Sequence, residues 1–387
     1  MFPVGRDGRV PTFSLRRTPH VSNGDLIHVV SNEGITDGRK RAGRFLIRGT
    51  FLLLLLVGGL QALDAFGYLD IGFKDWQPTM YAYILWCICL CVGQVVIRGE
   101  QGKRILFVLP AALFVVSLTV IPLVLGLAIA FSDWNLASPD GPKFAGLGNI
   151  EKMLRDPFYW NALGNMVWYS LAIVVELAIA FGLAMLLNTQ IRARKFFRVA
   201  FLLPLMLSPV AVSWMIGKSM LEFRFGPVSQ LARALGWEQP AFFASPEIAK
   251  ITMMALDAWI FIPFMMIMML AGLQGLPHEV VEAAKVDGAS SWQTFRKIIF
   301  PLMLPVTVTA FLVRLIFKLK LADIVITITG GGPGGATDTV TSFIYREYRD
   351  RSNVGYGTLL AMFYLVIIVI AMTGLMRGLN RWMRPYS

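Results

Sequence analysis

The chain has 387 residues, of which 56% are apolar and 16% are charged, and its formal net charge is +12. Soluble globular domains are close to half apolar and a quarter charged, so this composition excludes an ordinary soluble domain. The basic residues flank long apolar blocks and do not form one face, which argues against a nucleic-acid-binding protein.

The first segment, residues 1–43, is polar, rich in Gly and Arg, and without helical periodicity. This composition predicts a loosely ordered cytosolic tail. The first apolar block begins after residue 44 and is long enough to cross a bilayer, which disfavours a cleaved signal peptide.

From residue 44 onward the apolar residues fall in eight blocks of about 20 residues, the length that crosses a bilayer as a helix. Lipid leaves no partner for free backbone groups, so each block is expected to be helical. The sequence therefore predicts an all-α membrane protein with eight transmembrane helices, at 45–63, 79–97, 105–131, 164–187, 199–217, 249–272, 300–320 and 357–378.

Lys and Arg concentrate in alternate connections between these blocks, a bias that marks the cytosolic side of a membrane protein. They occur before the first block, after every second block and in the C-terminal tail, for example at Arg44, Arg98, Arg194, Lys297 and Arg381. The pattern predicts a multi-pass protein of the cytoplasmic (inner) membrane with both termini in the cytosol. It also explains the net charge without nucleic acid.

Residues 44–97 hold the first two blocks and look like an accessory pair, whereas residues 98–387 hold six blocks with longer loops. Proline recurs in four of the six later blocks, where it bends a helix and frees a backbone carbonyl. Proline is common in membrane helices generally, but this recurrence favours a transport bundle. The residues are Pro110, Pro122, Pro204, Pro209, Pro263, Pro301 and Pro305.

A polar segment with several acids, EVVEAAKVDGASSWQTFRKIIFP, separates the sixth and seventh blocks at 279–301. It begins with helix formers around Glu282, Ala283 and Ala284, continues with Asp287-Gly288, and ends at a proline. We expect two short helices joined at the glycine, because strong helix formers flank a residue typical of helix C-termini. Such a rigid protrusion would present a surface to a partner in the cytosol.

The seventh block contains Arg314, Lys318 and Lys320, and charges within a span are costly. Arg314 and Lys318 are four residues apart and share a helix face, whereas Lys320 is close enough to the external end to snorkel. One interpretation is pairing with an acid of another span, such as Asp257 or Glu176. The other is a substrate pathway lined by Arg314, Lys318, Lys320, Asp257 and Asp323.

The run TGGGPGGATDT at 329–339 follows a strand-like stretch, LADIVITIT, and nominally matches G-x-G-x-x-G. A dinucleotide site also needs a helix opening at the last glycine and an acid about 20 residues further on. Pro333 and the residues after it do not supply that context. We therefore expect a tight external turn.

The chain has no G-x-S-x-G or H-E-x-x-H motif, and its three cysteines and three histidines lack metal-ligand spacing. We expect no catalytic residue, no metal site and no cofactor bound by this chain. A membrane-embedded glycosyltransferase would need interfacial acids with metal-ligand spacing. A stand-alone secondary transporter would not need the helical protrusion, and no inverted repeat is evident.

The 279–301 segment resembles the EAA loop of binding-protein-dependent ABC importer permeases. That signature is Glu-Ala-Ala, three residues, Gly, nine residues, Ile, one residue and Leu-Pro. The chain has Glu282-Ala283-Ala284, Gly288, Ile298 and then Phe300-Pro301, so only the Leu position differs. The neighbouring stretches FLLPLMLSPVAVSWM and DIVITITGGGP are similar to the carbohydrate branch of this family, including its maltose-type members with two extra leading spans.

The resemblance implies a type I importer core of six helices preceded by two accessory helices. It also implies a second homologous permease subunit, two cytosolic ATPases that bind ATP and Mg, an external solute-binding protein and a carbohydrate substrate. The EAA loop, with Glu282, Ala283, Ala284, Asp287 and Gly288, would dock on an ATPase. That reading excludes an enzyme activity for this chain itself.

The seventh span departs from the pattern of many sugar and polyol permeases. Phe317 stands where an acid is common, and Lys318 is an additional cation. We infer from this excess of positive charge that the carbohydrate could carry a negative group. A neutral oligosaccharide or polyol is the default alternative.

Overall fold

The computed structural model describes residues 36–65, 69, 71–72, 75–139, 141–189, 192 and 194–383, so most of the expected N-terminal tail lies outside the described residues. The described chain is almost entirely helical, which confirms the all-α membrane fold. It divides into two compact units that meet in sequence between Leu123 and Val124.

The first unit contains α2 (Asp37–Ala65), α3 (Gln77–Arg98) and the larger part of α4 (Glu100–Ala130). Helices α2 and α3 pack as a hairpin through two facing glycines. A Cβ atom on Gly43 would lie 3.2 Å from the carbonyl oxygen of Gly93, and one on Gly93 would lie 3.3 Å from that of Gly43. Small residues of this kind let membrane helices approach closely.

The second unit is a bundle built on four long helices: α6 (Pro157–Asn188), α10 (Pro246–Gln274), α13 (Phe300–Leu319) and α16 (Val354–Met383). Its largest apolar core joins α6, α10 and α13 and includes Ile173, Met269 and Met303. Because α6, α10 and α13 share this core, they hold in place whatever polar side chains lie between them.

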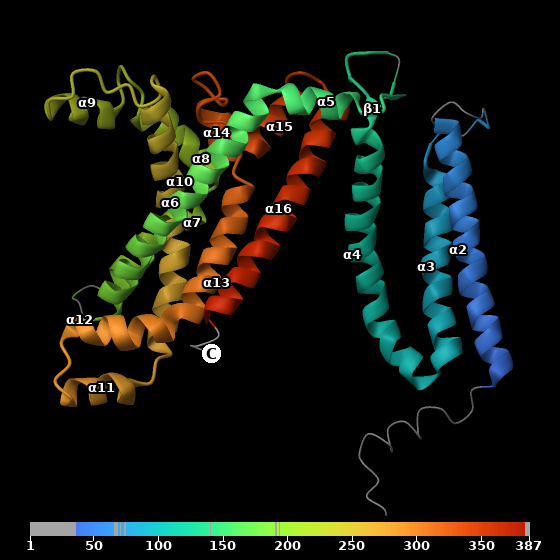
Figure 1. The fold of residues 1–387 in the computed structure, drawn as a ribbon, viewed down its shortest axis with the longest axis horizontal. Coiled ribbons are helices and arrows are strands. Elements are labelled where there is room, and N and C mark those ends of the chain that lie inside the picture. The colour runs from blue at the N-terminus through green and yellow to red at the C-terminus, as the bar shows by residue number, and fades with distance from the viewer. Residues whose placement is uncertain are drawn as a thin grey trace, which may run out of the picture. The chain divides into compact units, whose positions relative to one another are not determined.

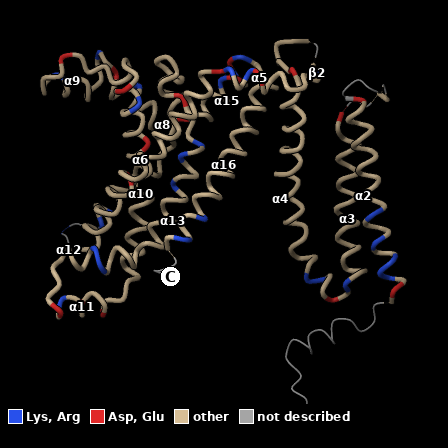
Figure 2. The backbone as a smooth tube through the Cα atoms, in the orientation of Figure 1, with Lys and Arg blue, Asp and Glu red and all other residues tan. Residues whose placement is uncertain are grey.

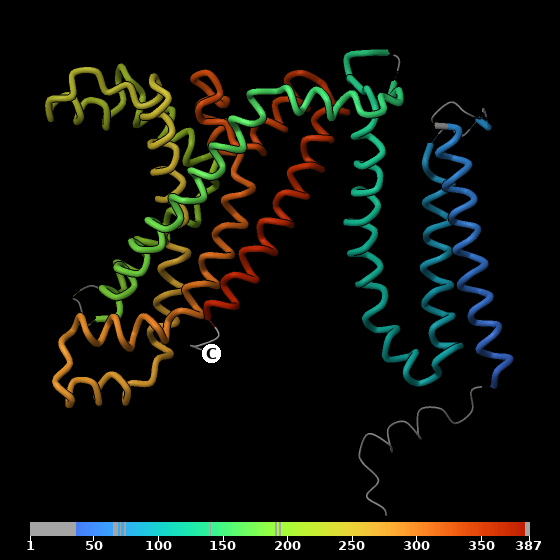
Figure 3. Tube along the Cα trace, viewed as in Figure 1, coloured from blue at the N-terminus to red at the C-terminus, as the bar shows by residue number. Residues whose placement is uncertain are grey.

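Short elements cover the two ends of this bundle (Figure 1). One end carries α5 (Gly148–Arg155), α9 (Pro227–Ala234), α14 (Asp323–Ile328) and α15 (Val340–Arg349). An antiparallel ribbon of β1 (Ser132–Asp133) and β2 (Lys143–Phe144) lies beside α5. The other end carries α11 (His278–Val286) and α12 (Ser291–Thr294), and α16 finishes there (Figure 3).

Seven described helices are long and apolar enough to cross a membrane, and a bent pair makes an eighth candidate. The bent pair replaces the single continuous helix expected at 199–217. It consists of α7 (Arg194–Met206), then α8 (Pro209–Val212) with the π-helix η1 (Ser213–Met220), and the two halves meet at 96°. The break follows from Pro209, which lacks an N–H and forces Ser208 into an extended conformation (ψ 135°).

The strand-like stretch before the glycine-rich run is also helical, as α14, so its expected strand conformation was wrong. β-Branched residues favour strands only where a neighbouring strand completes their hydrogen bonds. Here Ile324, Val325 and Ile328 are instead buried against the bundle. A short helix satisfies its own backbone groups, which suits a segment at the end of a membrane span.

Candidate functional site

The polar segment after α10 folds as two helices joined at a glycine, as expected. Helix α11 ends at Val286, and Gly288 reverses the chain with a φ of +75°. Ser290 then starts α12: its Oγ accepts a hydrogen bond from Gln293 N at 3.3 Å, and its own N–H donates to Gln293 Oε1 at 2.8 Å. This reciprocal cap fixes where the second helix begins.

The second helix does not end at Pro301 as expected but continues into the bundle. The π-helix η2 (Phe295–Ile299) joins α12 to α13 without an interruption. The ring centroid of Phe295 lies 5.6 Å from that of Phe181 on α6, in an edge-to-face arrangement. The protruding segment is therefore anchored both to α13 by the backbone and to α6 by aromatic packing.

The surface of this segment combines exposed charge with exposed apolar side chains. Glu282 and Asp287 are exposed, whereas Ala284 is only 6% exposed. Val286 and Trp292 are 87% and 66% exposed, although both are large and apolar. Clustered exposed apolar residues with charged neighbours are typical of a protein-binding surface.

Four charged side chains meet in the buried interior between α6, α10 and α13. Arg314 Nε lies 2.7 Å from Glu176 Oε2, and Lys318 Nζ lies 2.8 Å from Glu176 Oε1. Both cations also form ion pairs with Asp257. We call these four residues the ion cluster. Each of its side chains is at most 2% exposed.

Two aromatic rings cover the ion cluster. The guanidinium carbon of Arg314 lies 4.3 Å from the ring centroid of Phe261, and Lys318 Nζ lies 5.9 Å from that of Tyr169. Arg314 Nη1 and Asp257 Oδ1 are buried without a hydrogen-bond partner among the described residues. The cluster therefore keeps one unused donor and one unused acceptor inside the bundle.

The structure brings together only part of the candidate pathway set. Arg314, Lys318 and Asp257 are in the ion cluster. Their ion pairs agree with the first of the two interpretations, in which the cations pair with an acid of another span. Lys320 is exposed at the end of α13, and Asp323 is exposed at the start of α14. Asp323 is the first residue of α14, and Lys320 precedes it by three residues, so both belong to the end of the bundle that carries α14 and α15 (Figure 1).

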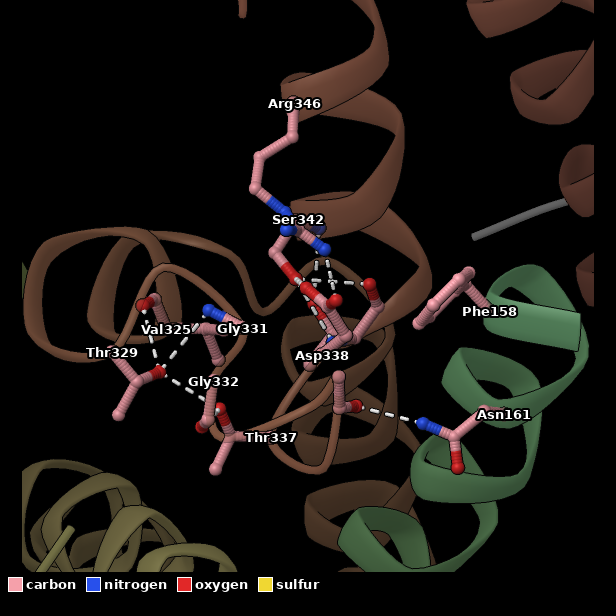
Figure 4. A network of polar contacts seen from close by, with 12 residues as sticks. Phe158, Asn161, Val325, Thr329, Gly331, Gly332, Thr337, Asp338, Ser342 and Arg346 are labelled. Atoms are coloured by element: carbon pink, nitrogen blue, oxygen red, sulfur yellow. Dashed lines mark hydrogen bonds and ion pairs between the residues drawn. The ribbon is translucent and has the colours of Figure 1, made fainter. Parts of the chain in front are cut away.

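The glycine-rich run forms a compact turn that is tied to α6 (Figure 4). Thr337 Oγ1 donates to the carbonyl oxygen of Gly332 at 2.7 Å and lies 2.7 Å from Thr329 Oγ1. Asn161 Nδ2 on α6 donates to the carbonyl oxygen of Gly335 at 2.7 Å. The hydroxyl groups close the turn, and the amide fixes its place against the bundle.

Asp338 is the polar centre of this turn, and the sequence interpretation missed it. Its carboxylate forms an ion pair with Arg346 and accepts a hydrogen bond from Ser342 Oγ at 3.0 Å. Burial raises the pKa of the Asp338 carboxyl above its usual value, while Arg346 opposes that rise. The one signal in the sequence was the spacing of Asp338, Ser342 and Arg346, which places all three on one face of the turn and α15.

Gly331 allows Asp338 to take this position. It adopts a φ of +91°, and a Cβ atom there would overlap the Asp338 carboxylate. The glycines of this run therefore serve a close approach of backbone to a side chain. Within the described residues, no three His, Cys, Asp or Glu side chains lie where they could share a metal ion.

Comparisons with known proteins agree on one family of transporters. A family model described as "Binding-protein-dependent transport system inner membrane component" matches residues 104–385. The sulfoquinovosyl glycerol transport system permease protein of Agrobacterium fabrum is 33% identical over 276 residues, which is 70% of this chain and 89% of that protein. The trehalose/maltose transport system permease protein of Thermococcus litoralis is 28% identical over 271 residues, covering 70% and 91%.

A solved structure supports the same fold. It is a bacterial alginate ABC transporter in complex with a periplasmic protein that holds an alginate pentasaccharide. One of its chains superposes with a TM-score of 0.62 and 19% sequence identity, and the match covers 81% of this chain and 99% of that chain.

Proposed function

This chain belongs to the family of binding-protein-dependent transport system inner membrane components, as a carbohydrate-type ABC importer permease, and from that premise we propose that it imports a carbohydrate using ATP hydrolysed by partner subunits. The observation that carries the proposal is the exposed α11–α12 segment, which continues directly into a helix of the bundle. A permease without its own nucleotide site needs such an external point of contact.

We propose that the working importer contains this chain, a second homologous permease, two cytosolic ATPases and an external solute-binding protein. The family description itself specifies dependence on a binding protein. ATP and Mg would be held by the ATPases. The chain would cross the inner membrane several times with the α11–α12 end and both termini in the cytosol, an orientation that the basic loops support.

The EAA segment is proposed to dock in a cleft of an ATPase. Glu282 offers an exposed carboxylate for a basic group, while Val286 and Trp292 offer apolar area that water leaves on binding. Gly288 sets the angle between the two short helices. Closure of the ATPase pair would then move α12 and, through η2, α13.

The ion cluster is proposed to lie on the pathway that this movement opens. In the described conformation it ties α6, α10 and α13 together and leaves no open polar channel at its position, because every side chain in it is buried. Separation of these helices would expose Arg314, Lys318 and Asp257 to a solute. Lys320 and Asp323 are exposed toward the proposed external end and would meet the solute first.

The charge balance of the ion cluster bears on the substrate. Two cations face two carboxylates, so Glu176 and Asp257 compensate the positive charge that Phe317 and Lys318 led us to expect as an excess. The argument for an acidic substrate from that excess no longer follows. We propose a neutral carbohydrate, and uptake of a labelled neutral sugar should be competed by neutral sugars and not by uronates.

Co-purification tests the proposed function. An affinity-tagged chain expressed with its neighbours should retain a cytosolic ATPase, and the Glu282→Lys variant should lose it. Glu238→Lys is the matched control, because Glu238 is exposed four residues after α9, a helix at the opposite end of the bundle (Figure 1). Absence of any nucleotide-hydrolysing protein with the intact chain, or accessibility of residues 279–297 from outside the cell, would overturn the proposal.

A further inference from the structure

One face of α2 packs on α3, and the opposite face points away from it. Gly43 lies against Gly93 and Ile97 of α3. Because successive residues turn by about 100° around a helix, Arg41, Phe45 and Arg48 project to the other side. All three are exposed, Phe45 by 81%.

The same outward face is apolar along the rest of the helix. Leu52, Leu55 and Leu56 are 64%, 55% and 60% exposed, and they continue the line of Phe45 and Arg48. Helix α2 is long and apolar enough to cross a membrane. With α3 on its other side, the outward face has the composition of a lipid-facing surface, and the arginines are at the end of that face where a span would enter the headgroup layer.

The position of these arginines on α2 is unfavourable for an isolated helix. Arg44 stands three residues after Arg41 and four residues before Arg48, so like charges are neighbours on the surface of α2 and repel one another (Figure 2). Asp37 offers little compensation, since among the described residues its carboxylate pairs with Lys40, at 3.9 Å. Arg41, Arg44 and Arg48 form no ion pair with any residue that the structure describes. An anion from outside the chain would remove this repulsion.

The length of α2 places Arg48 unusually deep. The uncharged stretch between Arg48 and Asp64, residues 49–63, is about 22 Å long as a helix, shorter than a hydrocarbon core of about 30 Å. Asp64 lies in the last turn of α2, where its Oδ1 accepts a hydrogen bond from Gly72 N at 3.2 Å. Arg48 must therefore extend its side chain toward the interface, which brings its guanidinium to the level of the lipid phosphates.

We propose that the arginine face of α2 (Arg41, Arg44 and Arg48) binds the headgroup of an anionic phospholipid. A guanidinium pairs with phosphate through two parallel hydrogen bonds, and three of them within two turns of helix can surround one headgroup. Basic clusters next to a membrane span are also attracted by the negative charge of an anionic leaflet. A zwitterionic headgroup brings its own cation and would compensate less.

The test measures which lipids the protein retains. The full-length chain in its complex is placed in nanodiscs of phosphatidylcholine with an increasing fraction of phosphatidylglycerol, and the bound lipids are counted by native mass spectrometry. The unmodified chain should enrich phosphatidylglycerol over phosphatidylcholine. In R44Q/R48Q that enrichment should fall by about fivefold per arginine, the factor that corresponds to about 1 kcal/mol for each basic residue at a membrane surface.

A matched pair of charges provides the control. Arg377 and Arg381 are exposed near the end of α16, so R377Q/R381Q removes the same charge elsewhere. R44K/R48K keeps the charge but loses the two parallel hydrogen bonds of each guanidinium. Its enrichment of phosphatidylglycerol should lie between that of the unmodified chain and that of R44Q/R48Q. Unchanged thermal unfolding of R44Q/R48Q in detergent without phosphatidylglycerol shows that the variant is folded.

Three results would overturn the proposal. The first is equal loss of enrichment in R377Q/R381Q, which would assign the effect to general surface charge. The second is no enrichment by the unmodified chain. The third is competition by soluble glycerol phosphate at the same concentration as the lipid, which would identify a site for free phosphate.

Discussion

Lys318 Nζ lies 2.8 Å from Glu176 Oε1, although the two residues are 142 positions apart in the chain. Arg314 makes the same connection from one helical turn earlier, and both cations also reach Asp257 on α10. Three helices of the bundle are thus held by a group of charges that cancel one another. Such a group costs free energy to bury, but breaking it in part costs more.

The first prediction concerns the energy of this cluster. Lys318→Met leaves two buried carboxylates with one cation and should destabilise the protein by about 3–5 kcal/mol, the usual cost of a buried charge that loses its partner. The charge-balanced double variant Lys318→Met with Glu176→Gln should lose less than the sum of the two single variants. Denaturant unfolding in detergent gives the three values, and their difference gives the coupling between the two residues. Additive losses would show that the pair does not interact.

The second prediction concerns the exposed carboxylate of α11. Glu282→Lys should abolish sugar uptake while the amount of protein in the membrane stays unchanged, because the reversed charge would repel the basic group that we propose on the ATPase. Glu238→Lys makes the same change at the other end of the bundle and should leave uptake near normal. Uptake of radiolabelled sugar by cells, normalised to immunodetected protein, is the measurement. Normal uptake in Glu282→Lys would remove this residue from the docking surface.

The third prediction concerns the glycine between α11 and α12. Gly288 has a φ of +75° and open space around its Cα, so a side chain meets no neighbour and only the backbone is strained. Asn adopts this conformation more readily than other residues, so Gly288→Asn should reduce uptake only mildly. Gly288→Asp adds a negative charge to the docking surface and should abolish it. Equal loss in both variants would mean that any side chain at this position blocks docking.

The fourth prediction compares two neighbouring glycines. Gly331→Ala should destabilise the protein by about 1–3 kcal/mol beyond the backbone strain, because its methyl group overlaps the buried Asp338 carboxylate. Gly330→Ala also strains the backbone, with a φ of +59°, but its Cβ has no neighbour within 4 Å. Thermal unfolding of both variants in detergent separates the overlap from the strain. Equal midpoints would mean that Asp338 moves aside without cost.

Hydropathy located the membrane spans well because the bilayer imposes a length on every helix that crosses it. It did not predict the 96° bend in the 199–217 block. The residues on both sides of Ser208 are similarly apolar. A proline such as Pro209 is equally compatible with a continuous helix that has a small kink. Which outcome occurs depends on the neighbouring helices, which the local sequence does not contain.

The candidate site was predictable where its determinants are local. The two helices at Gly288 follow from helix formers, a glycine and a capping serine that are adjacent in sequence. The two cations of the ion cluster are separated from its two carboxylates by 57 to 142 positions in the chain, so the sequence could name its members but not choose between pairing and an open pathway. Asp338 was missed because its burial depends on Gly331 and on the turn that places the two together.

Helices α12, η2 and α13 form one unbroken helix, which has a mechanical consequence. Trp292 at its exposed beginning and Lys318 near its far end are parts of the same continuous helix. In the proposed importer, an ATPase that binds Trp292 would move the buried charges through this helix, with no loop between the two positions. Movement of the ATPases and separation of the ion cluster would then be coupled directly, without an intervening flexible segment.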